Sequence, residues 1–145
     1  MLFSLFPDVA RRETRSITVP DRTPAGAVPP IPAGQYGFAE CFCVDPKCDC
    51  RRVIVAVLST RHKRQVATIN HAFEKPAKGS VVKEQTFLDP LNPQSKWSDT
   101  LMRLFLTILG DDPAYAARIV RHYKMVKDAV KDLTHPIHAR IAGTP

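Results

Sequence analysis

Four cysteines within ten residues constrain this chain more than any other feature of its sequence. They are Cys41, Cys43, Cys48 and Cys50, in the pattern C-x-C-x4-C-x-C. Residues i and i+2 of a β-strand point to the same side, so each Cys-x-Cys pair presents two thiols on one face. Between the pairs, Asp45-Pro46-Lys47 has the composition of a tight turn. The pattern predicts a hairpin that carries four sulfur atoms on one face.

Four thiolates at this spacing favour a structural zinc site with all four cysteines as ligands. Zinc binds four sulfur atoms tetrahedrally at about 2.3 Å, which leaves no position for a substrate. Clustered cysteines in a chain without signs of secretion bind metal more often than they form disulfides. Two alternatives stay open. One is a pair of cross-strand disulfides, Cys41–Cys50 and Cys43–Cys48. The other is a redox-reactive or iron–sulfur cluster, because thiolates alone do not select one metal.

The expected hairpin has a register that a structure can test. A turn over residues 44–47 determines which residues face each other: Cys43 and Cys48, Cys41 and Cys50, Glu40 and Arg51, and Phe38 and Val53. Three cations near the cluster are expected to offset the charge of the thiolates: Lys47, Arg51 and Arg52. On the opposite face of the strand, we expect Phe42 and Val44 to anchor the hairpin to the core.

One segment resembles a known family. Residues Cys48-Asp49-Cys50-Arg51-Arg52-Val53, preceded by Asp45-Pro46, are similar to a signature of an uncharacterised bacterial protein family. The later stretch Arg121-His122-Tyr123, in a helix that follows an Asp-Pro pair, resembles the C-terminal part of that family. The resemblance spans residues 38–130 and implies a zinc-binding cluster at the four cysteines, without any activity. Zinc modules at the end of bacterial secretion ATPases are a looser likeness, and their second cysteine pair is spaced differently.

Alternating and β-branched segments predict three or four strands after Gly34. The expected strands span residues 36–44, 52–58 and 66–73, with a weaker candidate at 81–88. The short connections between them favour an antiparallel meander, because parallel strands need long crossovers.

Two helices are predicted after the strands. The first has apolar residues at helical spacing from Trp97 to Ile108, with Ser95 or Ser98 as its N-cap and Gly110 at its end. The second has Asp112 as N-cap and Pro113 at the first helical position, and it continues to Leu133. Strands followed by helices indicate an α+β fold with both helices packed on the sheet.

The N-terminal third has a different composition. Residues 20–34 contain five prolines, which favour extended chain over helix or paired strand. We therefore divide the chain into a proline-rich arm, residues 1–33, and a single zinc-binding domain, residues 34–145. The arm is either disordered or wrapped around the domain. The 145 residues carry a net charge of +7 and no apolar run of about 18 residues. We expect a cytoplasmic protein.

One side of the second helix is basic. Its cations are Arg121, Lys124, Lys127 and Lys131. These side chains could contact an anionic partner or a nucleic acid. The simpler interpretation is a solvated helix face, since Asp128 interrupts the stripe and no aromatic side chain is interleaved for base stacking.

The first helix has a second apolar stripe, formed by Met102, Leu106 and Leu109. A helix that is apolar on two sides is normally buried. This helix is therefore either central in the fold, which we favour, or part of a homodimer interface.

Catalytic motifs are absent from the sequence. It has no glycine-rich phosphate loop and no nucleophile elbow, and its five histidines are scattered. We therefore lean against an enzyme and expect a non-enzymatic zinc-binding interaction module. The alternatives are a redox-active or thiol-dependent enzyme or sensor that uses the cysteines, and a nucleic-acid-binding protein that uses the basic helix.

Overall fold

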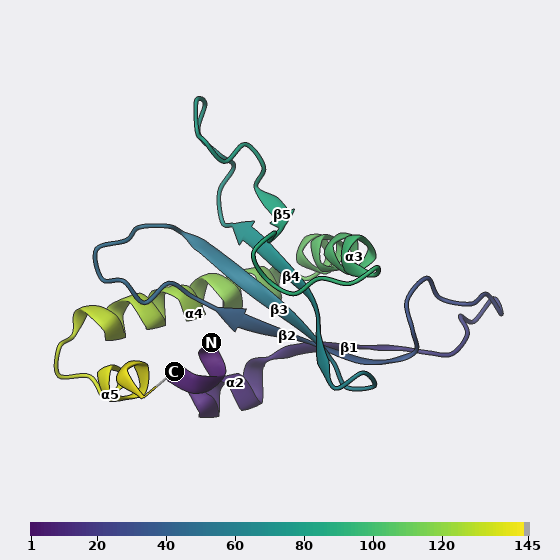
Figure 1. The fold of residues 1–145 in the computed structure, drawn as a ribbon, viewed down its shortest axis with the longest axis horizontal. Helices are drawn as coiled ribbons and strands as arrows, with labels where there is room; N and C mark the ends of the chain where they lie inside the picture. Colours follow the sequence, from purple (N-terminus) through teal and green to yellow (C-terminus); the bar gives the residue numbers. More distant parts are fainter. Residues whose placement is uncertain (144–145) are drawn as a thin grey trace.

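The computed structural model describes residues 1–143. Within them the elements are α1 (Leu2–Leu5), α2 (Pro7–Glu13), β1 (Arg15–Val19), β2 (Gly34–Cys41), β3 (Arg52–Ser59), β4 (Arg64–Ala72), β5 (Thr86–Leu88), α3 (Ser98–Asp111), α4 (Pro113–Lys131) and α5 (Ile137–Ala142). The strands form one antiparallel sheet in the order β1-β2-β3-β4-β5 (Figure 1). The predicted α+β class and antiparallel meander are confirmed, but the sheet has five strands and not three or four.

Alternate residues of the central strands form one wall of the hydrophobic core. Their fully buried side chains include Phe38, Val53, Val55, Val57 and Ile69. Helices α3 and α4 cover this face of the sheet: the ring of Phe105 in α3 lies 6.0 Å from that of Phe38 and 6.4 Å from that of Tyr115 in α4. The apolar side chains of sheet and helices thus form a single core, as in other α+β folds.

Residues 2–19 lie against the body of the protein. Leu2, Leu5 and Ala10 are buried in the core, and β1 pairs with β2 along its whole length. The short helices α1 and α5 lie side by side, and the guanidinium of Arg140 donates to the carbonyl oxygen of Leu5 at 2.6 Å. Residues 20–33, which hold five of the thirteen prolines, contain no helix or strand.

The predicted hairpin register is wrong by four residues. Phe38 pairs with Val57 and not with Val53, and Glu40 pairs with Val55 and not with Arg51. Strand β2 ends at Cys41 and β3 begins at Arg52, so residues 42–51 form a wide loop and not a tight hairpin turn. Arg51 has φ of 43°, a left-handed conformation outside the range of a regular β-strand. A shift of four residues keeps every side chain on its expected face, and so hydrophobic patterning alone does not exclude it.

The helix boundaries match the prediction in part. The carboxylate of Asp112 accepts a hydrogen bond from the backbone N–H of Tyr115 at 3.1 Å, which confirms the predicted N-cap of α4. The predicted serine cap of α3 is wrong: the helix has no side-chain cap. Ser98 instead lies inside its first turn, where the hydroxyl donates to the carbonyl of Val66 in β4 at 3.2 Å. That bond ties the start of α3 to the sheet.

Helix α3 is not buried on all sides. Its core side is formed by Leu101, Phe105 and Ile108, whereas Leu106 on the other stripe is 41% exposed. The favoured central position for this helix is therefore wrong, because α3 packs against β4, β5 and α4 but leaves one apolar side partly uncovered.

Candidate metal centre

Three of the four cysteines come together in the loop between β2 and β3. The sulfur atoms of Cys43, Cys48 and Cys50 all lie within 4.8 Å of one another. In a tetrahedral zinc site, a Zn–S distance of about 2.3 Å places the sulfur atoms about 3.8 Å apart. All four cysteines are free thiols, so neither of the alternative disulfides forms in this structure. The three close thiols can hold a metal ion.

Cys41 lies near these three residues but on a different element. It is the last residue of β2 and pairs with Ile54. Its side chain lines the same cavity of about 300 Å³ as the three clustered cysteines, together with Phe42, Arg52, Ile54 and Asn70. The structure therefore places three sulfur atoms in one group and the fourth on the wall of the cavity beside it.

Two apolar side chains and the hydrogen bonds of a turn hold the cysteine loop in place, largely as its sequence indicates. The ring of Phe42 lies 6.3 Å from that of Tyr123 in α4, and Val44 packs against the core, as expected for the two apolar neighbours of the cysteines. Asp45 begins a turn in which its carboxylate accepts from the backbone N–H of Lys47 at 2.9 Å and its carbonyl accepts from that of Cys48 at 3.2 Å. The backbone bonds of the turn bring Cys48 back toward Cys43.

The side chain of Lys127 in α4 is buried against the cysteine loop and binds two of its carbonyl groups. Only 6% of this residue is exposed, and its ammonium donates to the carbonyl of Asp45 at 3.0 Å and to that of Cys48 at 2.8 Å. The expected place of Lys127 on a solvated basic face is therefore wrong, because the cysteine loop folds over this side of α4. One signal pointed to its burial: Lys127 follows Tyr123 by four positions, and so it borders the apolar stripe of the helix.

The environment of the cluster shifts the pKa values of Cys43 and Cys50 in opposite directions. Burial opposes ionisation of Cys43, but the backbone N–H of Asp45, the thiol of Cys48 and the charge of Lys127 outweigh it and lower the pKa of Cys43 below its usual value. Burial raises the pKa of Cys50 to about 11, and the neighbouring thiols of the cluster add to this effect. A cation bound among the sulfur atoms would remove this mutual repulsion.

Of the three cations expected near the cluster, one lines the cavity. Arg52 donates from Nε to the side-chain oxygen of Asn70 at 2.6 Å, and both side chains form part of the cavity wall. Arg51 pairs with Glu74 at 2.7 Å, and Lys47 is exposed. A fourth cation, the buried Lys127, also contacts the cysteine loop, although the sequence pattern predicted it on the solvated face of its helix.

The remaining basic residues of α4 have different surroundings. Arg121 forms an ion pair with Glu13 of α2. Lys124 and Lys131 are exposed. They line a second cavity, of about 400 Å³, beside the cysteine loop, together with Lys127 and with Lys47, Asp49 and Asp128.

A buried group of charged residues lies beside Cys41, and no pattern in the sequence indicated it. His122 is 1% exposed and Glu40 is 2% exposed. The ring nitrogens of His122 lie 2.6 Å from a carboxylate oxygen of Glu40 and 2.6 Å from one of Glu13. The two carboxylates raise the pKa of His122, which favours a charged ring that donates from both nitrogens. This group links α2, β2 and α4.

The pH dependence of stability follows from these two hydrogen bonds. Burial disfavours the charged ring, but Glu40 and Glu13 outweigh it and raise the pKa of His122 above 6.5. The hydrogen bond from His122 lowers the pKa of Glu13 below 4.5, although partial burial opposes it and Arg121 adds to it.

We therefore expect the contribution of His122 to be complete below pH 6.5 and to disappear as the pH rises through its raised pKa. The contribution of Glu13 is complete above pH 4.5 and disappears as the pH falls through its lowered pKa. Thermal unfolding midpoints measured from pH 4 to pH 9 should show a maximum between these limits. In His122→Gln the alkaline decline should be flatter, and an unchanged decline would contradict this assignment.

No protein-family model matches the chain, and comparison with curated proteins and with solved structures finds no similar protein. The resemblance to a bacterial family therefore stays a prediction. Among the helices of residues 1–143, none is long and apolar enough to cross a membrane. What the chain does must be inferred from its own residues.

Proposed function

We propose that the cysteine loop binds one zinc ion and that the protein is a non-enzymatic interaction module held in shape by this metal. The observation that carries the proposal is the group of three thiols, Cys43, Cys48 and Cys50, within 4.8 Å of one another. We assign Cys41 as the fourth ligand, since its side chain lines the same cavity. Four thiolates close the coordination shell of zinc, and a closed site stabilises structure and does not activate water.

The surroundings of the loop support a structural role. Phe42 and Lys127 hold the loop against α4 from two sides, so the cluster is built into the fold and does not project from it. Metal binding to such a loop is linked to folding, because the thiols converge only in the folded chain. The exposed cations Lys47, Lys124 and Lys131 line a cavity beside the loop together with Asp49 and Asp128, and the excess of positive charge there favours a partner with negative charge.

Metal content tests the proposal directly. Protein purified without chelators or a metal-affinity step should contain one zinc ion per chain by native mass spectrometry with elemental analysis. Cys43→Ser removes one of the three close ligands and should lose the metal. Cys41→Ser should keep zinc with lower affinity, and its cobalt-substituted form should show the spectrum of three thiolate ligands and not four.

The same preparation tests the thiol-chemistry alternative. The lowered pKa of Cys43 favours a reactive thiolate in the metal-free protein. Protein without metal, with two fewer free thiols than its four cysteines, would overturn the zinc proposal and support a redox function. Ready alkylation of the cysteines at neutral pH, with the fold retained, would have the same meaning.

A further inference from the structure

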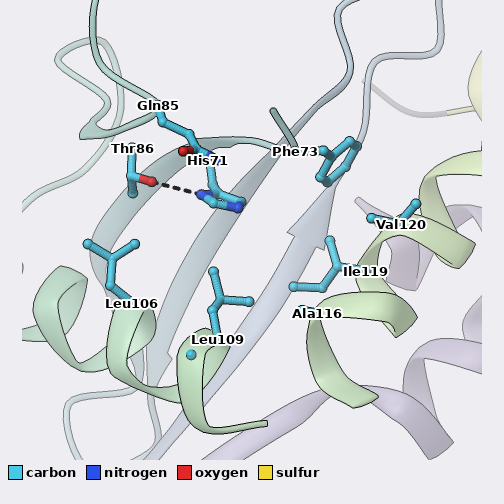
Figure 2. A pocket seen from close by; sticks show the side chains of 10 residues that line it. His71, Phe73, Gln85, Thr86, Leu106, Leu109, Ala116, Ile119 and Val120 are labelled. Atoms are coloured by element: carbon cyan, nitrogen blue, oxygen red, sulfur yellow. Dashed lines mark hydrogen bonds between the residues drawn. The ribbon is translucent and has the colours of Figure 1, made fainter. Parts of the chain in front are cut away.

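The second apolar stripe of α3 has no part in the metal site. Its residues Leu106 and Leu109 line a cavity of about 290 Å³ between the end of the sheet and the helices (Figure 2). The other side chains around this cavity come from β4, β5 and α4 and their flanking residues: His71, Phe73, Gln85, Thr86, Ala116, Ile119 and Val120. The size is at the lower end of the range for small-molecule sites, which is about 300–1,000 Å³.

One polar side chain is held in position at the cavity wall. The Nδ1 atom of His71 lies 2.7 Å from the hydroxyl of Thr86, and the edge-to-face ring of Phe105 lies 5.6 Å away. Figure 2 shows the second ring nitrogen, Nε2, on the side of the ring turned away from Thr86. Among the described residues, Nε2 has no hydrogen-bond partner. Burial, with the charge of Arg52, lowers the pKa of His71, so that the imidazole is neutral at neutral pH.

Two small residues belong to the lining of the cavity. Gly110 and Ala116 line the cavity where α3 ends and α4 begins. A helix disfavours glycine at such a position, and Gly110 is not among the glycines with positive φ, so its backbone does not require it. A Cβ atom placed on Gly110 would meet nothing within 4 Å. The position therefore borders open space, and packing alone does not account for a glycine there.

The chemistry of the lining defines what fits. With His71 neutral, none of the described residues around the cavity carries a charge. An anionic or cationic ligand would lose its hydration there without gaining a counter-charge. We propose that the cavity binds a small uncharged compound with an apolar, ring-sized body and one hydroxyl group, which hydrogen-bonds to Nε2 of His71. A hydroxyl group can donate or accept, so it suits either tautomer of the ring.

Three compounds of similar shape test this assignment: phenol, toluene and benzoate. Titration of ¹⁵N-labelled, zinc-loaded protein, followed by NMR, should show phenol shifting the resonances of His71, Leu109 and Ala116. Toluene lacks the hydroxyl and should bind about threefold to tenfold more weakly. Benzoate should not bind. Binding of benzoate as tightly as phenol, or no shift with phenol at these residues, would overturn the proposal.

Variants separate the cavity from the rest of the surface. Ala116→Leu fills the space with a good helix former and should abolish binding of phenol and toluene. His71→Phe should remove the preference for phenol over toluene. Gly110→Ala, which suits a helix, should keep the fold and weaken both ligands. Leu91→Ala, at a residue that is 92% exposed, should change nothing. If phenol binds equally well to folded Ala116→Leu and Gly110→Ala proteins, the site lies elsewhere and the inference is wrong.

Discussion

Glu40→Ala is expected to destabilise the fold by about 3–5 kcal/mol, the usual cost of removing one partner from a buried ion pair. The charged ring of His122 would then lie in the core without the carboxylate that contacts Nδ1 at 2.6 Å. Losing its proton would relieve the charge but leave a buried ring nitrogen unpartnered. Urea unfolding at pH 6, where the wild-type ring is protonated, measures the loss.

Two further variants show whether the pair itself carries this effect. Glu13→Ala removes the other carboxylate bound to His122, but its side chain is 28% exposed and its loss should cost much less. The double variant Glu40→Leu with His122→Phe replaces the pair by apolar groups and should recover much of the stability, because no buried charge remains. A small loss for Glu40→Ala, or a double variant less stable than Glu40→Ala, would contradict the assignment of a buried charged pair.

Lys127→Met is expected to loosen the cysteine loop while keeping the apolar stem of the side chain. The carbonyl of Cys48 would lose a charged donor, and the carbonyl of Asp45 would keep only its bond from the backbone N–H of Cys48. A hydrogen bond to a charged group contributes about 1.5–3 kcal/mol. We expect zinc affinity to fall by about 10–100-fold, as it does when other groups that orient metal ligands are removed. Competition with a chromophoric chelator measures the affinity, and urea unfolding measures the stability.

Lys124→Met is the matched control for this prediction. Lys124 lies on the same helix and lines the same cavity beside the loop as Lys127, but it is exposed. It carries the same charge, so its replacement tests the loss of net charge near the metal without the loss of the two hydrogen bonds. Equal falls in zinc affinity for the two variants would mean that Lys127 acts through its charge alone and does not hold the loop.

Local patterns in the sequence were enough for the central strands, for α3 and α4 and for the general place of the site, but they did not predict β1, α1, α2 or α5. The β-branched segment from Arg52 to Leu58 predicts β3 almost to the residue. Asp112 before Pro113 predicts the start of α4, since a carboxylate can accept the unpaired N–H groups of a helix end. The turn residues between the cysteine pairs indicated that the chain reverses there, which brings the thiols near one another.

Packing between distant segments decided the rest. The loop length set the hairpin register, and a shift of four residues leaves the pattern of buried positions unchanged, so sequence periodicity could not detect it. The surroundings of Lys127 and His122 depend on residues about 80 to 110 positions away in the chain, among them Asp45, Glu40 and Glu13. Composition and spacing thus determined an α+β chain with a clustered thiol site. Only the tertiary structure decided which charges support that site, because a helix pattern shows which residues share a side but not what folds over it.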